Sequence, residues 1–340
     1  MEHRTIGRTG IQVSPLCLGA MMFGPWGNPD HDDCARIVHR ALDAGINFID
    51  TADVYSAGES EEIVGKALKG RRDDVVLATK FTGQMGDGVN RKGHSRKWIL
   101  EEVDNSLRRL GTDYIDLYQA HRPDLSTDLD ELLGTLSDLI HVGKVRAIGS
   151  STFPAHHVVE AQWVSERRGR ERFQCEQPPY SIFVRGIERD VLPVCEKYGI
   201  GVIPWSPLAG GWLGGKHRKG QPAPTSGRAA MQPQRFDPER PEVQQKLDLV
   251  EDLVALAEGV GLSLIDLALG FVTAHPAVTS AIIGPRTMEQ LEDQLGALEV
   301  HLADDVLDRI DEIVPPGTNL NPGDAGWEPP SIADKRRRRR

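Results

Sequence analysis

Four side chains of different chemical type mark the ends of short apolar segments in the first 121 residues of the chain. Asp50, Lys80 and His121 each close such a segment, and Tyr55 follows Asp50 within the next loop. The carboxyl ends of neighbouring parallel strands meet at one rim of a barrel, where active sites are found. If the three segments are successive strands, these side chains converge although roughly thirty to forty residues separate them along the chain.

This set of residue types can donate a proton to a carbonyl oxygen that is receiving hydride. A free phenol has a pKa near 10, too high for an efficient acid at neutral pH. An ammonium group beside the phenol favours the phenolate, and a carboxylate beside the ammonium keeps it charged and in place. An imidazole N–H can bind the carbonyl oxygen, where negative charge develops. We therefore predict Tyr55 as the acid, Lys80 and Asp50 as its supports, and His121 as the group that orients the carbonyl.

Each of these residues also has a purely structural interpretation. An aspartate at a strand end commonly caps a helix or a turn, and a lysine there covers the rim. A lone histidine is usually a hydrogen-bonded structural group, and Tyr55 alone is an ordinary loop aromatic. Their joint placement at consecutive strand ends is what favours catalysis.

Short apolar runs separated by helical periodicity predict the architecture that would position these groups. Runs without strict alternation indicate parallel strands that are buried on both faces. Eight such runs favour an α/β fold of the (β/α)8 TIM-barrel type over an open doubly wound sheet. They are residues 16–18, 46–49, 75–78, 114–118, 144–148, 173–176, 200–204 and 279–283. Residues 5–6 and 11–13 predict a small hairpin before the first of them.

Two helix starts are visible in the sequence. Ile99, Val103, Leu107 and Leu110 recur at helical spacing, with Ser95 as the expected N-cap. Residues 263–266 carry the pattern of a capping box in front of an apolar helix.

Two segments interrupt the alternation of strands and helices. Residues 207–242 are irregular and rich in glycine, proline and basic residues, and a loop of this length is usually a functional lid or a tolerated insertion. Its cations Lys216, His217, Arg218 and Lys219 would suit an anionic ligand beneath the loop, and both interpretations stay open. We expect one barrel domain over residues 1–314 and a mobile C-terminal extension over residues 315–340, extended at 317–330 with Trp327 as an anchor.

Composition limits the function classes. The net charge of the 340 residues is −10, and it is −16 without the six basic residues of 335–340, so only this tail could bind nucleic acid. No apolar run approaches the length of a membrane span. Four scattered cysteines predict neither a disulfide framework nor a zinc site, and we expect no bound metal and a cytoplasmic location.

The segments 45–55 and 58–68 resemble the signature of the aldo-keto reductase family, and the resemblance spans nearly the whole chain. Lys80 and the run His121-Arg122-Pro123 fall where that family carries its lysine and histidine. The resemblance implies an NADPH-dependent (β/α)8 reductase of a small aldehyde or ketone, with Tyr55 as proton donor. It also implies that the N-terminal hairpin caps the barrel bottom and that the loop after strand seven folds over the pyrophosphate.

The same resemblance implies a set of contacts to NADPH or NADP+. Ser151, Thr152 and Gln177 would bind the carboxamide, although many relatives have Ser-Asn where this chain has Ser151-Thr152. Trp205 would stack on the nicotinamide, and Arg286 would replace other cations as ligand of the 2′-phosphate. The implied positions are Gly19, Met21, Met22, Asp50, Ser151, Thr152, Gln177, Trp205, Ser206, Leu208, Gly210, Gly284, Arg286, Gln290 and Gln294.

The substrate pocket is expected to include Trp26, Tyr55 and His121, with the C-terminal segment near it. The carbonyl compound and the oligomeric state stay open. Two other functions also stay open: a cofactor-sensing regulatory subunit that turns over slowly, as in the potassium channel β subunits that resemble this family, and a polyanion binder acting through the tail.

Overall fold

A ring of eight parallel strands forms the centre of the computed structural model, which describes residues 2–222 and 232–339. Each of the eight predicted apolar runs overlaps one of these strands, with ends that differ by a few residues. The strands are β3 (Leu16–Gly19), β4 (Phe48–Asp50), β5 (Val76–Phe81), β6 (Ile115–Ala120), β7 (Val145–Ser151), β8 (Cys175–Gln177), β9 (Gly201–Val202) and β10 (Ala281–Ile283).

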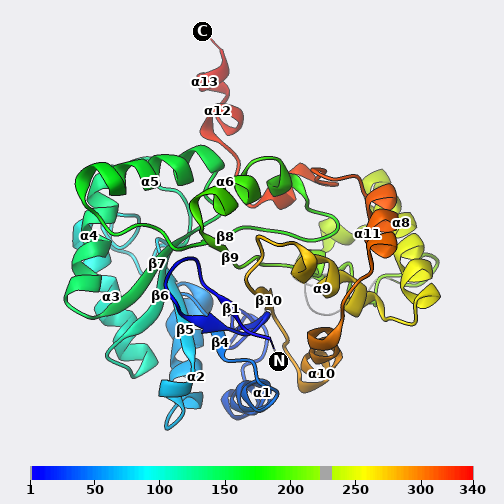
Figure 1. The fold of residues 1–340 in the computed structure, drawn as a ribbon, viewed down its shortest axis with the longest axis horizontal. Coiled ribbons are helices and arrows are strands. Elements are labelled where there is room, and N and C mark those ends of the chain that lie inside the picture. Colours follow the sequence, from blue (N-terminus) through cyan, green and yellow to red (C-terminus); the bar gives the residue numbers. More distant parts are fainter. Residues whose placement is uncertain (1, 223–231, 340) are drawn as a thin grey trace.

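The sheet closes on itself. Its order is β10-β3-β4-β5-β6-β7-β8-β9, with every neighbouring pair parallel. The two ends are joined by parallel bridges from Val202 to Val278 and from Trp205 to Ile282, and Ile282 N donates to Pro204 O at 2.9 Å. The prediction of a (β/α)8 barrel is therefore confirmed, and the open doubly wound sheet was the wrong alternative (Figure 1).

Helices surround the ring of strands (Figure 1). They are α1 (His31–Asp43), α2 (Glu59–Ala67), α3 (Arg96–Leu110), α4 (Leu129–His141), α5 (Ala155–Arg168), α6 (Val191–Tyr198), α8 (Pro241–Gly259), α9 (Leu264–Ala274), α10 (Met288–Leu295) and α11 (Asp304–Ile313). Both predicted helix starts are confirmed, because the Ser95 side chain accepts a bond from Trp98 N and Ser263 forms a capping box with Asp266.

The N-terminal hairpin closes one end of the barrel, as expected. Its strands β1 (Arg4–Thr5) and β2 (Gln12–Val13) pair antiparallel. Ile6 and Val13 are fully buried and pack against the inward-facing side chains of the barrel, such as Phe48 and Leu117. The opposite, carboxyl end of the strands is thereby left as the open face.

The connection that follows β9 contains more structure than predicted. Its described part includes the short 3₁₀ helices η4 (Ala209–Gly211) and η5 (Pro233–Phe236), and α8 begins at Pro241. Residues 223–231 of the predicted loop lie outside the described residues.

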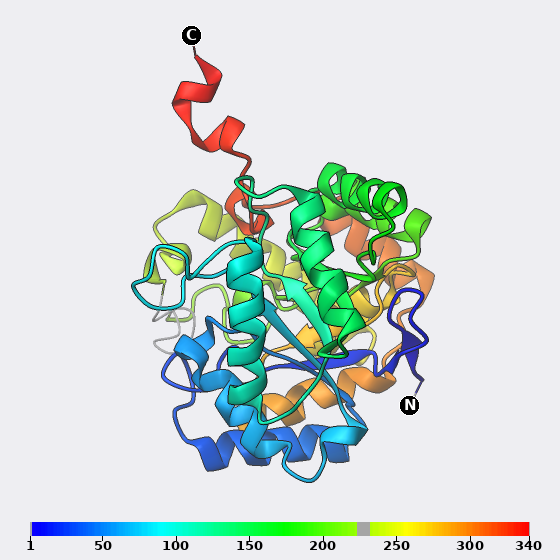
Figure 2. The same ribbon diagram turned by 90° about the vertical axis from the view of Figure 1, so that its left-hand side faces the viewer.

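The segment after α11 is folded against the barrel rather than extended throughout. It contains the 3₁₀ helix η7 (Pro322–Ala325), and Leu320 N donates to Phe183 O at 3.1 Å. Two helical turns, α12 (Pro330–Ala333) and α13 (Lys335–Arg338), then project away from the barrel in both views (Figures 1 and 2). The domain boundary at residue 314 stays a prediction.

Within the described ranges, no single helix has the length and apolar composition needed to cross a membrane. Helices α8 and α9 meet that requirement only when taken together, across a bend of 89°.

Candidate active site

Lys80 stands at the centre of the predicted catalytic group. It lies in β5 next to Asp50 at the end of β4, since the parallel register pairs Asp50 with Ala78. The Lys80 amine donates to Asp50 Oδ1 at 2.6 Å, to Thr51 O at 2.8 Å and to the Tyr55 hydroxyl at 3.2 Å. Neighbouring strands thus bring together residues that lie far apart in the sequence.

The surroundings of Lys80 keep its amine charged. Burial alone would lower its pKa, because Lys80 has no exposed surface. The charges of Asp50 and Tyr55 and the hydrogen bonds to both outweigh that effect, so the pKa of Lys80 is raised above its usual value. A fixed cation therefore faces the phenol oxygen at neutral pH.

His121 lies beside Tyr55 from the end of β6. The two ring centroids are 5.6 Å apart and the planes are nearly perpendicular, at 81°. Burial, with the nearby charges of Lys80 and Arg122, holds the pKa of His121 well below its usual value. The imidazole is therefore neutral at pH 7 and can offer one ring N–H to a bound oxygen.

The turn that carries Tyr55 is conformationally strained. Ser56 and Ala57 have φ angles of 49° and 56°, in the left-handed region that non-glycine residues rarely adopt. The Ser56 hydroxyl donates to Phe23 O at 3.1 Å, and a Cβ on Gly58 would lie 2.8 Å from Arg109 Cδ. The turn is held by contacts on both sides, which fixes where the phenol points.

Arg109 anchors this turn through buried charge. Its guanidinium contacts Glu61 at 2.6 Å and Glu102 at 2.5 Å, and both carboxylates are fully buried. Burial raises the pKa of Glu61, and the ion pair with Arg109 opposes that rise. Sequence analysis did not predict this cluster, because Glu61 lies on α2 whereas Glu102 and Arg109 lie on α3.

A cavity of about 600 Å³ opens beside Tyr55 and His121 at the carboxyl ends of the strands. Trp26 and Asp50 also line it. Most of the positions implied for the cofactor share its wall. They are Gly19, Met21, Met22, Asp50, Gln177, Trp205, Ser206, Leu208, Gly210, Gly284, Arg286, Gln290 and Gln294.

Ser151 and Thr152 differ from this expectation, since neither belongs to the residues that line the cavity. Both are buried: Ser151 Oγ donates to Gln177 O at 2.8 Å, and Thr152 Oγ1 accepts from Trp205 Nε1 at 3.4 Å. These hydrogen bonds hold Trp205 and Gln177 in place at the cavity wall. Gln177 in turn donates to Asp50 Oδ2 at 2.9 Å, which ties it to the catalytic group.

The basic residues of the long connection divide into two pairs. Lys216 and His217 line the cavity, as expected for an anion beneath the loop. Arg218 and Lys219 do not, because they form ion pairs with Glu251 and Asp248 of α8. Arg235 also lines the cavity, where it forms an ion pair with Asp324, and no periodic pattern or motif in the sequence indicated it.

Several features of the wall fit a dinucleotide. A Cβ at Gly210 or Gly284 would meet no atom within 4 Å, so a ligand can approach the backbone there. Gln294 Oε1 is buried at the cavity and has no hydrogen-bond partner among the described residues. Arg286 N donates to Gln290 Oε1 at 2.8 Å, and both residues line the cavity.

Trp26, expected in the substrate pocket, and Trp327, expected as an anchor of the C-terminal extension, differ in placement. Trp26 lines the cavity, and its ring centroid lies 6.1 Å from that of Tyr55. Trp327 is outside the lining and packs near His157, at 6.3 Å between centroids. The neighbouring Gly326 instead contacts the active site, because a Cβ there would lie 2.7 Å from Trp205 Cζ2.

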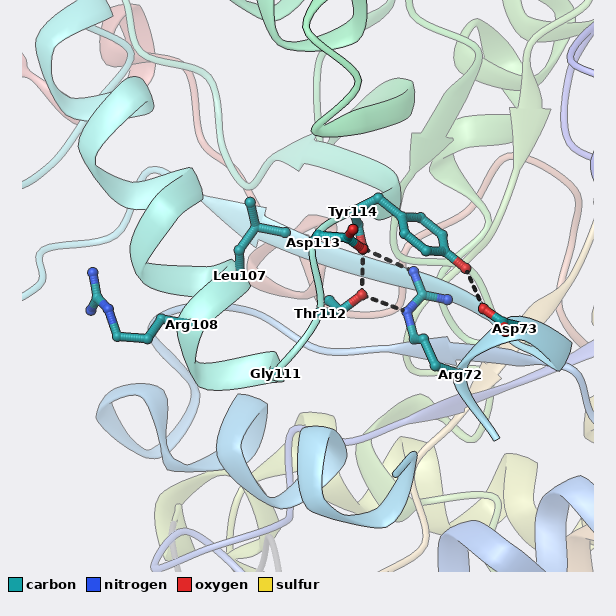
Figure 3. Close-up of a pocket in the computed structure, with 8 residues that line it drawn as sticks. All are labelled: Arg72, Asp73, Leu107, Arg108, Gly111, Thr112, Asp113 and Tyr114. Carbon is teal, nitrogen blue, oxygen red and sulfur yellow. Dashed lines mark hydrogen bonds between the residues drawn. The ribbon is translucent and has the colours of Figure 1, made fainter. Parts of the chain in front are cut away.

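A second pocket, shallow and open, lies at the opposite end of the strands (Figure 3). Its polar groups are engaged with one another: Arg72 donates to Tyr114 O at 2.9 Å and to Thr112 Oγ1 at 3.2 Å, and the Tyr114 hydroxyl donates to Asp73 at 3.4 Å. Arg72 is also paired with Asp116 at 2.7 Å. These contacts join residues 72–73 to residues 112–116, between the end of α3 and the start of β6. We therefore interpret this pocket as a structural feature.

Comparison with known proteins gives one consistent result. Residues 15–315 match the family described as "Aldo/keto reductase family". The chain is 40% identical over 338 residues to an uncharacterized oxidoreductase, YrpG, of Bacillus subtilis, covering 96% of this chain and all of that protein. It is 37% and 36% identical to probable voltage-gated potassium channel β subunits of rice and Arabidopsis thaliana, covering 92% of this chain and 97% of each relative.

Proposed function

Because the chain belongs to the aldo/keto reductase family of oxidoreductases, we propose that it reduces a small aldehyde or ketone to the alcohol with NADPH. The observation that carries this proposal is the Lys80 amine, placed 3.2 Å from the Tyr55 hydroxyl and 2.6 Å from Asp50. Bound NADPH would supply a hydride from its nicotinamide ring to the carbonyl carbon. The residues of this chain then have to orient the carbonyl and protonate its oxygen.

Tyr55 is the proton donor in this proposal, and His121 orients the carbonyl. Both side chains line the same cavity, so one oxygen can lie within reach of the phenol and the imidazole. The neutral imidazole donates its N–H to the oxygen on which negative charge develops. The Lys80 ammonium stabilises the negative charge that Tyr55 acquires when it gives up its proton, and Asp50 holds the ammonium in place.

The cofactor would lie along the wall formed by Trp205, Gln177 and the segment that begins at Gly284. Trp205 offers a π-face for the nicotinamide, and Gln177 offers an amide for its carboxamide. Lys216 and Arg286 provide positive charge for the phosphates. Arg286 has no carboxylate partner within salt-bridge distance in the described ranges, which supports NADPH over NADH.

The test compares wild type with Tyr55→Phe. NADPH oxidation is followed with a panel of aromatic and aliphatic aldehydes, and NADPH binding is measured separately by fluorescence. We expect turnover by wild type and a loss of about 10²- to 10⁴-fold in kcat for Tyr55→Phe, with cofactor affinity retained. Tyr198→Phe, on α6 and away from the cavity, is the matched control. Equal rates for Tyr55→Phe and wild type would show that the assigned acid is wrong.

A second candidate is a partner-binding subunit with slow turnover. It is favoured by the similarity to relatives that are named as potassium channel β subunits. Stable co-purification with a larger protein, together with very slow hydride transfer, would support it. A chain that purifies alone and reduces aldehydes rapidly would exclude this second candidate function.

A further inference from the structure

Arg122 is a cation in the cavity wall that neither the catalytic group nor the cofactor site uses. It directly follows His121 at the end of β6. Its Nη1 donates to His121 O at 2.6 Å and lies 3.4 Å from Ser151 Oγ, and the guanidinium carbon lies 5.8 Å from the centroid of the Trp205 ring. These contacts hold the guanidinium between His121, which is proposed to orient the carbonyl, and Trp205, which is proposed to stack on the nicotinamide.

The charge of Arg122 is not neutralised by the residues around it. Arg72, Arg109 and Arg185 are also withdrawn from solvent, and each is paired with a carboxylate at 2.8 Å or less. In the part of the chain that is described, no carboxylate lies within 4.0 Å of Arg122. Burial lowers the pKa of Arg122, as expected for a cation without an ion-pair partner.

Glu176, the carboxylate whose charge acts on Arg122, does not fill this role. Its Oε2 accepts from the Ser150 hydroxyl at 2.5 Å, and its Oε1 accepts from Phe153 N at 3.1 Å. Burial raises the pKa of Glu176 to about 7, so the carboxyl is only partly ionised at neutral pH. A half-buried arginine without a full counter-charge is costly to maintain unless a ligand supplies the anion.

The free edge of the guanidinium has the geometry of a carboxylate binder. The contacts to His121 and Ser151 use Nη1, which leaves the edge formed by Nε and Nη2 without a partner among the described residues. Elsewhere in the chain this edge grips carboxylates with two bonds: Arg40 binds Glu292 at 2.6 and 2.9 Å, and Arg218 binds Glu251 at 2.9 and 2.7 Å.

The position of Arg122 separates it from the cations assigned to the cofactor phosphates. In the closed ring, β6 lies four strands from β10 in either direction, so Arg122 is on the opposite side of the barrel from Arg286, which follows β10. Arg122 shares its side of the cavity with His121 and Tyr55.

We propose that Arg122 binds a carboxylate of the substrate, so that the preferred substrates are aldehydes or ketones that carry a carboxylate group. This inference rests on the proposed reductase function. Trp26, on the wall beside Tyr55, supplies an apolar face for the carbon skeleton between the two functional groups.

The test uses pairs of substrates in which a charged carboxylate is replaced by its neutral methyl ester. They are 2-, 3- and 4-carboxybenzaldehyde and the methyl ester of each, and the three positions measure the distance between carbonyl and carboxylate. We expect wild type to favour at least one acid over its ester in kcat/KM by about 30-fold, and Arg122→Gln to lose that preference mainly through KM. Arg122→Lys should keep part of it, because a single charge remains without the two-bond geometry.

Two controls separate this proposal from general damage and from the proposed function. Lys216→Gln removes another cavity cation and should leave the ratio of acid to ester unchanged. Binding of the corresponding alcohols, 3- and 4-(hydroxymethyl)benzoate and their methyl esters, is measured by calorimetry with and without NADP+. Preferential binding of an acid form that Arg122→Gln abolishes supports the proposal even if reductase activity is absent.

Two results would overturn it. Equal losses for acids and esters in Arg122→Gln would mean that Arg122 acts on the carbonyl or the cofactor. Wild type that neither binds the acids more tightly nor turns them over faster than the esters would show that no carboxylate site exists. Failure of the reductase proposal has a different signature, namely NADPH binding without oxidation by any aldehyde of either class.

Discussion

The Lys80 amine reaches the Tyr55 hydroxyl from inside the protein, at 3.2 Å and without exposure to solvent. Water therefore does not screen the charge of the Lys80 amine that faces the phenol. Tyr55 also lines the cavity, so the phenol lies between this buried amine and the space for a substrate. The Lys80 amine contacts Tyr55, the proposed acid, and also pairs with the buried Asp50, so mutations at Lys80 and Asp50 can separate effects on activity from effects on stability.

Lys80→Met should lower kcat by about 10²- to 10⁴-fold, because the charge that stabilises a deprotonated Tyr55 is removed. It should also lower the free energy of unfolding by about 3–5 kcal/mol, since Asp50 is left buried without its cation. In the double variant Lys80→Met/Asp50→Asn we expect recovered stability without recovered activity. Denaturant unfolding and NADPH oxidation measure the two effects, and recovery of activity would contradict the assignment.

Arg109→Met should destabilise the fold by about 3–5 kcal/mol and slow catalysis. Glu61 and Glu102 would be left buried without a cation, and the turn that carries Tyr55 would lose the contact at Gly58. The neighbouring exposed residue provides the control, since Arg108→Met removes the same charge from the same helix. Similar unfolding free energies for both variants would exclude a role for the cluster.

His94 should make stability depend on pH between about 4 and 6.5. Burial lowers its pKa from 6.5 to about 4, although Asp124 opposes the change. The unfolded chain therefore binds a proton in this range that the folded chain rejects, so stability is complete above pH 6.5 and is lost as the pH falls toward 4. The difference corresponds to about 3 kcal/mol.

His94→Gln keeps a polar partner for Thr82 and should reduce this dependence, as measured by unfolding at pH 7.0 and pH 4.5. His141→Gln, at an exposed position of α4, should leave it unchanged. An equal loss of stability on acidification in wild type and His94→Gln would assign the effect to other groups.

Arg286→Gln should weaken NADPH binding by about 10- to 100-fold and leave NADH binding nearly unchanged. The reason is that the guanidinium faces the cavity, and a 2′-phosphate is the group that distinguishes the two cofactors. Equilibrium titration with both cofactors measures the preference. Equal losses of affinity for NADPH and NADH would show that Arg286 does not bind the 2′-phosphate.

Much of the architecture could be predicted because it depends on local pattern. Apolar runs of three to five residues located all eight strands, and the side-chain chemistry of Ser95 and Ser263 located two helix starts. The roles of the basic residues in the long connection after β9 could not be predicted in the same way. Arg218 and Lys219 share the composition of Lys216 and His217, but α8 presents carboxylates to the first two only.

The residue types at the strand ends could be identified from the chain alone, because burial on both faces selects apolar runs and a polar residue marks where each run stops. Which of those groups share a charge environment became evident only once the barrel was folded. The closed ring places Lys80 between Asp50 and Tyr55, buries Arg109 between two carboxylates, and leaves Arg122 without one. Electrostatic interactions depend on distance and burial in space, and neither quantity is encoded by separation along the chain.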